Sequence, residues 1–212
     1  MRRVPGDPGR TRRLMATGCA ADGADLSLRL RTAPIVLYDP AMRQACLGVF
    51  DLNVPAFFSP SERILFEEYL EAAPARYMAL LLDGGVAACG GFYVMPRERI
   101  AGLCWGMVRP DCQHRGAGKR MLLTRLRIVT LGSPVDRVIL DTSQNAKGFY
   151  SHFGFLETTV KRDGYAPGLD RVEMTLPVDG RTRRNLLRRC RRLGFASPPE
   201  LESGPRPKRK AE

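Results

Sequence analysis

The most informative segment of the chain is Gln113-His114-Arg115-Gly116-Ala117-Gly118-Lys119. An apolar run over residues 101–108 precedes it and predicts a β-strand, and apolar residues at helical spacing over 118–131 predict a helix after it. Glycines at 116 and 118 let the backbone approach a ligand and aim consecutive N–H groups outward, and the positive end of the helix adds to this effect. Strand, glycine turn and helix together predict an anion site that suits a pyrophosphate.

Two familiar phosphate-binding patterns are excluded by single residues. A Walker A loop would need glycine at Gln113 and a hydroxyl residue at Arg120, and a dinucleotide-binding loop would need Gly or Ala at Met121. Arg115, Lys119 and Arg120 offer positive charge for a phosphate. Taken alone, the segment is equally compatible with a glycine turn that only caps a core helix, so other parts of the chain must support the anion site.

The chain before this segment predicts two strands in a hairpin, preceded by a strand and two helices. The first strand covers 35–38 and the first helix covers 42–49. Ser59, Pro60 and Glu62 are typical of a capping box, which starts a second helix that ends near residue 73. Asp83-Gly84-Gly85 joins strands over 76–82 and 86–95, so this pair is antiparallel.

The chain after the segment predicts a second strand that is parallel to 101–108. Residues 138–140 are short and wholly apolar, and a right-handed crossover through the helix would place them beside 101–108. A helix over 145–153 follows, with strands near 155–160 and 171–176. The fold class is therefore α/β, a mixed (α+β) sheet with helices packed on it.

Two motifs together resemble a known family. Gln113-x-x-Gly116-x-Gly118 resembles the acyl-CoA pyrophosphate loop of the GNAT superfamily of N-acetyltransferases. The second signature of that family is similar to Asn145-Ala146-Lys147-Gly148-Phe149-Tyr150 with Phe153-Gly154-Phe155. The likeness extends loosely over 34–177 and covers neither tail. It implies a GNAT-like fold, with a mixed sheet of six to seven strands, a central splay and about four flanking helices.

The resemblance also implies a cofactor and the residues that bind it. Acetyl-CoA would lie with its pantetheine arm along the splayed strand, where unpaired N–H and C=O groups can bond its amides. Its pyrophosphate would lie on the glycine loop. The expected cofactor-binding residues are Gly106, Met107, Val108, Gln113, His114, Arg115, Gly116, Ala117, Gly118, Lys119 and Asn145.

The reaction implied is acetyl transfer to a primary amine by direct attack in a ternary complex. The resemblance assigns the general acid to Tyr150, and it assigns the carbonyl oxygen to a backbone N–H around Met107 or Val108. Glu98 is the first candidate for the base, with Glu62 and Glu67 as alternatives, and bulk water could also take the proton. The acceptor would lie between the helix over 61–73 and the loop over 165–168.

Length and composition limit the class of protein. The 212 residues suit one domain, and with 44% hydrophobic and 26% charged residues no stretch approaches the ~18 apolar residues of a membrane span. Six cysteines without a C-x-x-C pair predict neither a zinc site nor disulfides. Cys104 and Cys112 raise an acyl-enzyme route, but neither has an evident activating histidine. We expect a metal-free, cytoplasmic enzyme.

The net charge of +12 is concentrated in the two ends of the chain. Residues 1–33 predict an unstructured basic arm, 34–177 the N-acetyltransferase domain, and 178–212 a basic tail that is partly helical or disordered. Either Met1 or Met15 is compatible with the natural start.

The C-terminal tail leaves other functions open. Leucines and a cysteine at helical spacing among arginines over 181–193 predict a basic amphipathic helix. This helix could dock on the domain, touch an acidic membrane or bind RNA, and nucleic-acid contact is possible over 181–210. A non-catalytic acyl-CoA sensor, or a regulator that contacts nucleic acid through this tail, is therefore the alternative function. A homodimer is the default oligomer.

Overall fold

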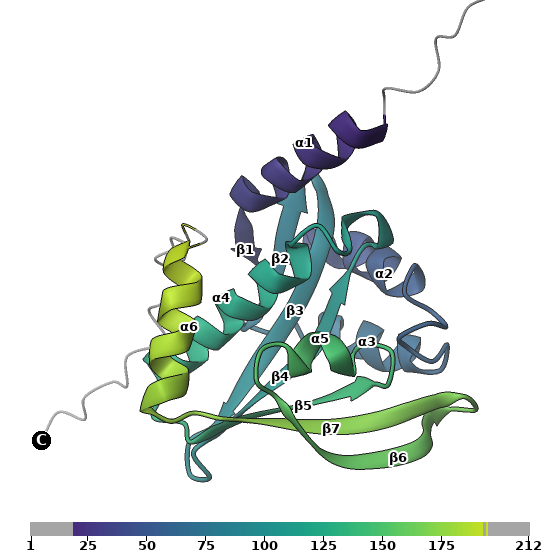
Figure 1. Ribbon diagram of the computed structural model, residues 1–212. Helices are drawn as coiled ribbons and strands as arrows, with labels where there is room; N and C mark the ends of the chain where they lie inside the picture. The colour runs from purple at the N-terminus through teal and green to yellow at the C-terminus, as the bar shows by residue number, and fades with distance from the viewer. Residues whose placement is uncertain (1–18, 193, 195–212) are drawn as a thin grey trace, which may run out of the picture.

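A computed structural model describes residues 19–192 and 194, shown in Figure 1. One seven-stranded sheet has the order β1-β2-β3-β4-β5-β7-β6. Its strands are β1 (Ile35–Leu37), β2 (Tyr77–Leu82), β3 (Gly85–Met95), β4 (Ile100–Val108), β5 (Arg137–Ser143), β6 (Leu156–Ala166) and β7 (Leu169–Pro177). The helices are α1 (Cys19–Thr32), α2 (Arg43–Asp51), α3 (Glu62–Glu71), α4 (Ala117–Gly132), α5 (Lys147–Ser151) and α6 (Gly180–Arg192), with 3-10 turns η1 (Pro40–Met42) and η2 (Pro110–Cys112). The predicted mixed sheet is confirmed.

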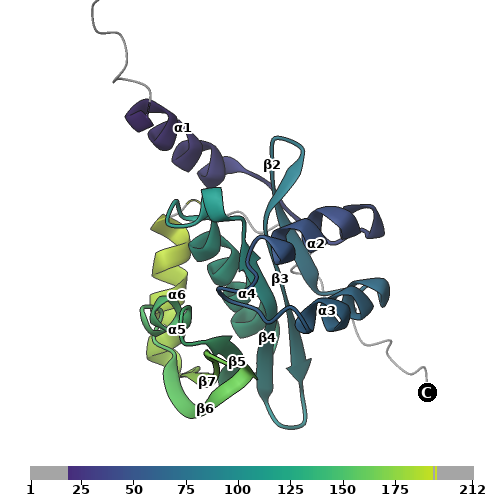
Figure 2. The same ribbon diagram turned by 90° about the vertical axis from the view of Figure 1, so that its right-hand side faces the viewer.

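Helices cover both faces of the sheet, as Figure 2 shows edge-on. The helices α4, α5 and α6 lie on one face, and α2 and α3 lie on the other. The predicted apolar stripe of α4 is confirmed, because Leu122, Leu126 and Val129 are all buried in the larger core cluster. The second cluster is rich in aromatic rings, including Phe50 and Phe66, and it lies under α2 and α3. Two separate cores therefore support the two faces.

The hairpin between β2 and β3 forms as predicted. Asp83 and Gly84 both have positive φ, 52° and 75°, and Leu82 pairs with Gly85. A two-residue turn with both central residues at positive φ matches the twist of an antiparallel pair, which is why Asp-Gly suits it.

The strand β4 is paired on both sides at one end only. It pairs with β3 along its length but with β5 only through Ile100–Gly102, which face Arg137–Ile139 in parallel. From residue 103 onward the two strands part, and Figure 1 shows the gap between them near α5. The predicted strand-helix-strand unit and the predicted splay are both present.

A β-bulge marks the point where β4 leaves β5. The pairs Cys89–Met107 and Gly91–Cys104 enclose one residue on β3 but two on β4. Trp105, one of these two, has φ 47°, and its carbonyl accepts a 3.1 Å hydrogen bond from the buried Tyr77 hydroxyl. A bulge bends and twists its strand, so it gives a local reason for the splay.

The N-terminal arm differs from its prediction over 19–32, where the chain is helical. Leu30 of α1 is only 1% exposed and packs in the larger core cluster together with Leu26. The Arg120 guanidinium donates hydrogen bonds to the carbonyls of Leu30, at 2.8 Å, and Ala33. Leu26 and Leu30 are four residues apart, as in a helix, but Asp25, Arg29 and Arg31 beside them favoured an exposed arm in the sequence analysis. The rest of the predicted arm, 1–18, lies outside the described residues.

The predicted basic amphipathic helix is present as α6. Its Leu186 and Cys190 are buried in the larger cluster, and α6 packs on α4. The Arg183 guanidinium donates to the carbonyls of Thr130 and Val135. No helix in the described ranges is both long and apolar enough to cross a bilayer. Residues 193 and 195–212 lie outside those ranges.

Candidate acyl-CoA and acceptor site

The glycine loop connects the open end of β4 to the start of α4. Gly116 has φ 96° and precedes the first helical residue, Ala117. Among the residues that the structure describes, the backbone N–H groups from Gly116 to Lys119 have no hydrogen-bond acceptor. Unpaired N–H groups at a helix start can bind anions, so the loop is compatible with the anion site that the sequence predicts.

Gln113 does not face the ligand side of this loop. Its amide nitrogen lies 3.1 Å from the Val108 carbonyl oxygen and 3.2 Å from Asn53 Oδ1, and its backbone N–H donates to Pro110. The buried Asn53 side chain donates to the same Val108 carbonyl at 3.0 Å. The Gln113 side chain therefore stabilises the loop by bonding it to the end of β4 and to Asn53. Asn53 is a residue that sequence reasoning missed, since nothing local links positions 53 and 113.

The basic residues of the loop divide between two directions. His114 and Lys119 are exposed, and Arg115 is half-buried. Arg120 instead turns toward α1, where it bonds the carbonyls of Leu30 and Ala33, and burial lowers its pKa. Arg120 is therefore not available to a phosphate, contrary to the sequence-based expectation.

The backbone N–H groups of Met107 and Val108 point to opposite sides of β4. The Arg109 N–H donates to Ala87 of β3, and successive residues of a strand point their backbone groups to opposite sides. The Met107 N–H is thus directed at β3, whereas the Val108 N–H is directed at the gap beside β5. Of the two residues expected to hold the carbonyl oxygen, Val108 has the suitable orientation.

Tyr150 and Gly106 meet at the gap. A Cβ atom on Gly106 would lie 3.4 Å from the Tyr150 hydroxyl oxygen, so that hydroxyl reaches the open stretch of β4. The Tyr150 ring packs edge-on against Phe149 and Phe155, which fix its direction. The Asn145 side chain donates at 2.6 Å to the Ala56 carbonyl and so ties the turn before α5 to the α2–α3 connection.

Arg125 is a second residue that the sequence analysis did not find. It is 3% exposed, and its guanidinium donates to the carbonyls of Gly91, at 3.2 Å, and Met121, at 3.4 Å. A Cβ atom on Gly106 would lie 3.0 Å from one of its terminal nitrogens. No carboxylate among the described residues forms an ion pair with it. Burial raises the pKa of the nearby Cys104 thiol, and the charge of Arg125 opposes that rise.

Acidic groups gather on the opposite face, toward α3. Glu62 accepts the Ser59 N–H at 2.7 Å, which is half of the predicted capping box, and burial raises its pKa. Burial also raises the pKa of Asp141 on β5. Burial, then the charges of Asp141 and Glu62, raise the pKa of Tyr165, so the three side chains lie near one another.

The other two carboxylates considered as bases are not brought to the gap. Glu98 lies in the turn before β4, and that strand runs roughly 20 Å from its first residue, Ile100, to Gly106 at about 3.3 Å per residue. Glu67 forms ion pairs with Arg43 at 2.5 Å and Arg63 at 3.2 Å. Within the described ranges there is no group of three or more His, Cys, Asp or Glu side chains that could hold a metal ion.

A family model described as Acetyltransferase (GNAT) family matches residues 46–155. No curated protein sequence matches the chain. Solved structures with the same fold include the ribosomal-protein-S18-alanine N-acetyltransferase from Escherichia coli, which has 23% identity, covers 70% of this chain and 95% of its own, and has a TM-score of 0.57.

Two further structures extend this likeness at lower identity. Ard1 from Thermoplasma volcanium has 15% identity and a TM-score of 0.59, over 69% of this chain and 98% of its own. The N-acetylglutamate synthase from Neisseria gonorrhoeae, solved with coenzyme A and N-acetyl-glutamate, has 16% identity and a TM-score of 0.53, over 69% of this chain and 35% of its own.

Proposed function

The chain belongs to the GNAT family of acetyltransferases, and from that premise we propose that it transfers an acetyl group from acetyl-CoA to a primary amine by direct attack in a ternary complex. One observation carries the proposal: β4 is unpaired toward β5 from residue 103, and the Tyr150 hydroxyl and the glycine loop lie at that opening. An amide-bearing ligand can complete the open strand edge.

The residues at the opening fit acetyl-CoA, which supplies the acetyl thioester. The backbone N–H groups from Gly116 to Lys119 would hold the pyrophosphate, with Arg115 and Lys119 adding positive charge. The edge of β4 at Gly106 would bond a pantetheine amide, because the Val108 carbonyl already accepts hydrogen bonds from Asn53 and Gln113. A glycine at 106 leaves room at the opening, because a side chain there would press on the Arg125 guanidinium and the Tyr150 hydroxyl.

Three groups on β4, α4 and α5 would act on the reacting atoms. The Val108 N–H donates to the carbonyl oxygen as that oxygen gains negative charge. Tyr150 gives its hydroxyl proton to the departing sulfur. The Arg125 charge, buried beside Gly106, stabilises negative charge on the sulfur before the proton arrives, because a charge in a dry site acts strongly.

Glu62 replaces Glu98 as our proposed base. It lies on the face of α3, beside Tyr165 and within the same acidic group as Asp141, whereas Glu98 is at the far end of β4. The Asp141 carboxylate is paired with Arg171 at 2.8 Å, whereas Glu62 forms no ion pair among the described residues, so Glu62 is the carboxylate that can receive a cationic acceptor, which enters as an ammonium ion and loses its proton to Glu62 before attack. The acceptor class is therefore a basic amine.

Thiol release from acetyl-CoA across a panel of amines tests this function. We expect turnover with basic primary amines, and a Tyr150→Phe variant that binds coenzyme A as the unmodified enzyme does but turns over slowly. A protein that binds coenzyme A and releases no thiol with any amine would be the acyl-CoA sensor instead.

We also propose a cytoplasmic location for this enzyme. Cys46, Cys89, Cys104, Cys112 and Cys190 are free thiols. A reducing compartment keeps such thiols unpaired. The homodimer stays a prediction, which sedimentation of the purified protein would check.

A further inference from the structure

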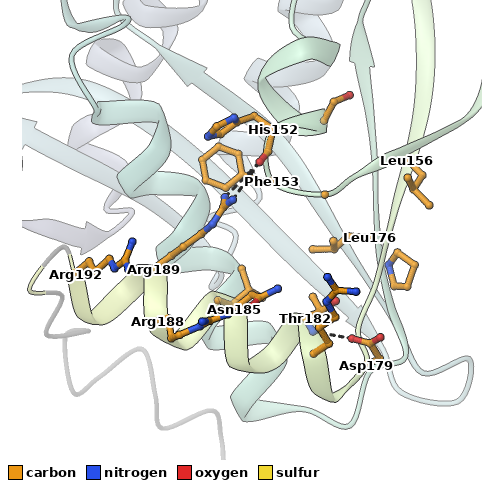
Figure 3. A pocket seen from close by; sticks show the side chains of 15 residues that line it. His152, Phe153, Leu156, Leu176, Asp179, Thr182, Asn185, Arg188, Arg189 and Arg192 are labelled. Atoms are coloured by element: carbon orange, nitrogen blue, oxygen red, sulfur yellow. Dashed lines mark hydrogen bonds between the residues drawn. The ribbon is translucent and has the colours of Figure 1, made fainter.

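A basic groove of about 760 Å³ lies between α6 and the turn from α5 to β6, and Figure 3 shows it from close by. Its α6 wall carries Arg181, Arg188, Arg189 and Arg192, and its other wall includes His152 and Leu156. We define these residues as the α6 groove. The volume is within the range of small-molecule sites and is large enough for a nucleotide.

The α6 groove is separate from the opening of β4. It is lined by α6, the end of α5, and the strands β6 and β7, and none of its lining residues belongs to β4, the glycine loop or α3. Leu176 and Pro177 in its wall pair with Val138 and Arg137, which are at the closed end of the β4–β5 pair. A ligand here would occupy a second site.

The arginines of the groove lack carboxylate partners within the described chain. The single acidic residue among the lining residues is Asp179, whose carboxylate accepts the Thr182 N–H at 2.6 Å, and that bond lowers its pKa. Arg189 lies over the Phe153 ring at 5.1 Å and reaches the His152 carbonyl at 3.4 Å, as Figure 3 shows. Its guanidinium thus forms part of a flat wall with positive charge.

The positive charge continues on the other side of α6. A second hollow is lined by Arg184, Leu187, Arg188 and Arg191. From Arg181 to Arg192 the helix advances roughly 16 Å, at 1.5 Å per residue, which is enough for several phosphates of one strand. In the sequence, Arg206, Lys208, Arg209 and Lys210 follow, outside the described residues.

An acidic membrane does not fit α6. An amphipathic helix binds lipid by inserting its apolar face, but Leu186 and Cys190 are 5% and 4% exposed and pack in the protein core. The side of the helix that is available to a partner carries the guanidinium groups and a single half-buried leucine, Leu187. A flat, partly apolar groove beside that side suits a base, while the arginines suit phosphates.

We propose that α6 and its groove bind single-stranded nucleic acid. Arg181, Arg188 and Arg192 contact phosphates, and one base lies in the groove against the His152 ring, the Arg189 guanidinium and the exposed Leu156. The phosphate contacts make the binding dependent on salt, and the groove makes it stronger than binding to a polymer that has charge alone.

Fluorescence anisotropy of the full chain tests this proposal, with labelled 12-nucleotide RNA and DNA strands and a polyglutamate of equal charge. The test variant is Arg188→Gln with Arg192→Gln. The control is Arg31→Gln with Arg162→Gln, which removes equal charge away from α6. We expect the test variant to lower affinity for an oligonucleotide roughly tenfold and to reduce the salt slope by about 1.4, at about 0.7 per phosphate on a single strand. The control should change neither, and coenzyme A affinity should be the same in all.

Several outcomes would overturn the proposal. These are equal losses in the test and control variants, affinity for polyglutamate equal to that for the oligonucleotides, and binding only to phosphatidylserine vesicles. A His152→Ala variant sharpens the result, because loss of a stacking surface should weaken oligonucleotide binding without changing the salt slope. Salt-dependent binding of either the RNA or the DNA strand that the test variant weakens supports the proposal.

Discussion

The two halves of β4 have different environments although they belong to one strand. In the closed half, Ile100–Gly102 are paired with β3 and β5, and the space above Gly102 is filled by the Tyr93 ring. In the open half, residues 103–108 pair with β3 alone, and Gly106 faces Arg125 and Tyr150. The difference teaches that pairing, rather than composition, makes this strand a binding edge. The closed half is hydrogen-bonded to a neighbouring strand on both edges, whereas the open half has a neighbouring strand on one edge only.

Substitution of Gly106 in the open half and of Gly102 in the closed half should give the largest difference between the two halves. Gly106→Val would place atoms at the Arg125 guanidinium and the Tyr150 hydroxyl, so coenzyme A affinity should fall by roughly 100-fold, since both side chains would be displaced into the opening. Gly102→Ala is the control, because it displaces only the half-exposed Tyr93 ring. It should lower the melting temperature and leave coenzyme A binding intact, as measured by calorimetry. Equal binding by both variants would contradict the contrast.

Removing one hydroxyl from each half is the next test. Tyr150→Phe should lower kcat roughly 100-fold, because a lost general acid is worth this much, with coenzyme A affinity nearly unchanged. Tyr93→Phe, at the closed half, should keep full turnover. If both variants turn over alike, Tyr150 is not the acid.

The acid limb of the pH profile tests the proposed base. Burial raises the pKa of Glu62, so its carboxylate forms at a higher pH than that of an ordinary glutamate, and kcat/KM should rise with pH through that pKa. Glu62→Gln should lower kcat/KM roughly 100-fold at neutral pH and remove this limb.

The raised pKa of Glu62 also affects stability, which should fall with rising pH where kcat/KM increases. A raised folded-state pKa means that folding favours the protonated form, so the contribution of Glu62 to stability is present at low pH and is lost as pH rises. Glu62→Gln should therefore keep or raise the melting temperature at neutral pH. Glu98→Gln is the control for both measurements, and it should leave the dependence of kcat/KM on pH unchanged.

Arg125 gives a smaller effect, with its own pH signature. Because its charge favours a thiolate at the opening, coenzyme A should bind more tightly as pH rises toward the thiol pKa of about 8.5. A coenzyme A analogue without the sulfur should bind equally at every pH. Arg125→Met should abolish the pH dependence and lower kcat roughly fivefold, and it should also lower the melting temperature, since the Gly91 carbonyl loses a donor. An unaltered pH dependence would show that Arg125 is only structural.

The closed half should tolerate the loss of its ion pair. Arg99 and Asp136 form two 2.7 Å hydrogen bonds, but both side chains are more than half exposed. Exposed pairs contribute little, so Arg99→Gln should change the melting temperature slightly and coenzyme A affinity not at all. A clear loss of coenzyme A affinity would mean that the two halves are coupled.

Local features were readable from the sequence. The Asp83-Gly84 turn and the glycines of the loop require backbone conformations that few residues adopt, so each marks its own structure. The role of Tyr150 was predicted from a resemblance and stays a prediction; the structure adds that its hydroxyl lies close to Gly106.

Features that depend on distant contacts were not readable. The link between Asn53 and Gln113 joins residues that are 60 positions apart, and Arg125 occupies a helix position whose surroundings come from β3 and β4. Glu98 precedes β4 in sequence but is at its closed end in space, since only the strand pairing defines which end opens. The α1 helix was missed because its two buried leucines lie among charged residues.

Amide hydrogen exchange with and without acetyl-CoA measures the claim about the two halves directly. We predict that acetyl-CoA protects the amides of Val108 and of Gly116 to Lys119, while the amides of Ile100 to Gly102 exchange as before. Unchanged exchange at Val108 and the loop, or protection confined to the closed half, would contradict the account.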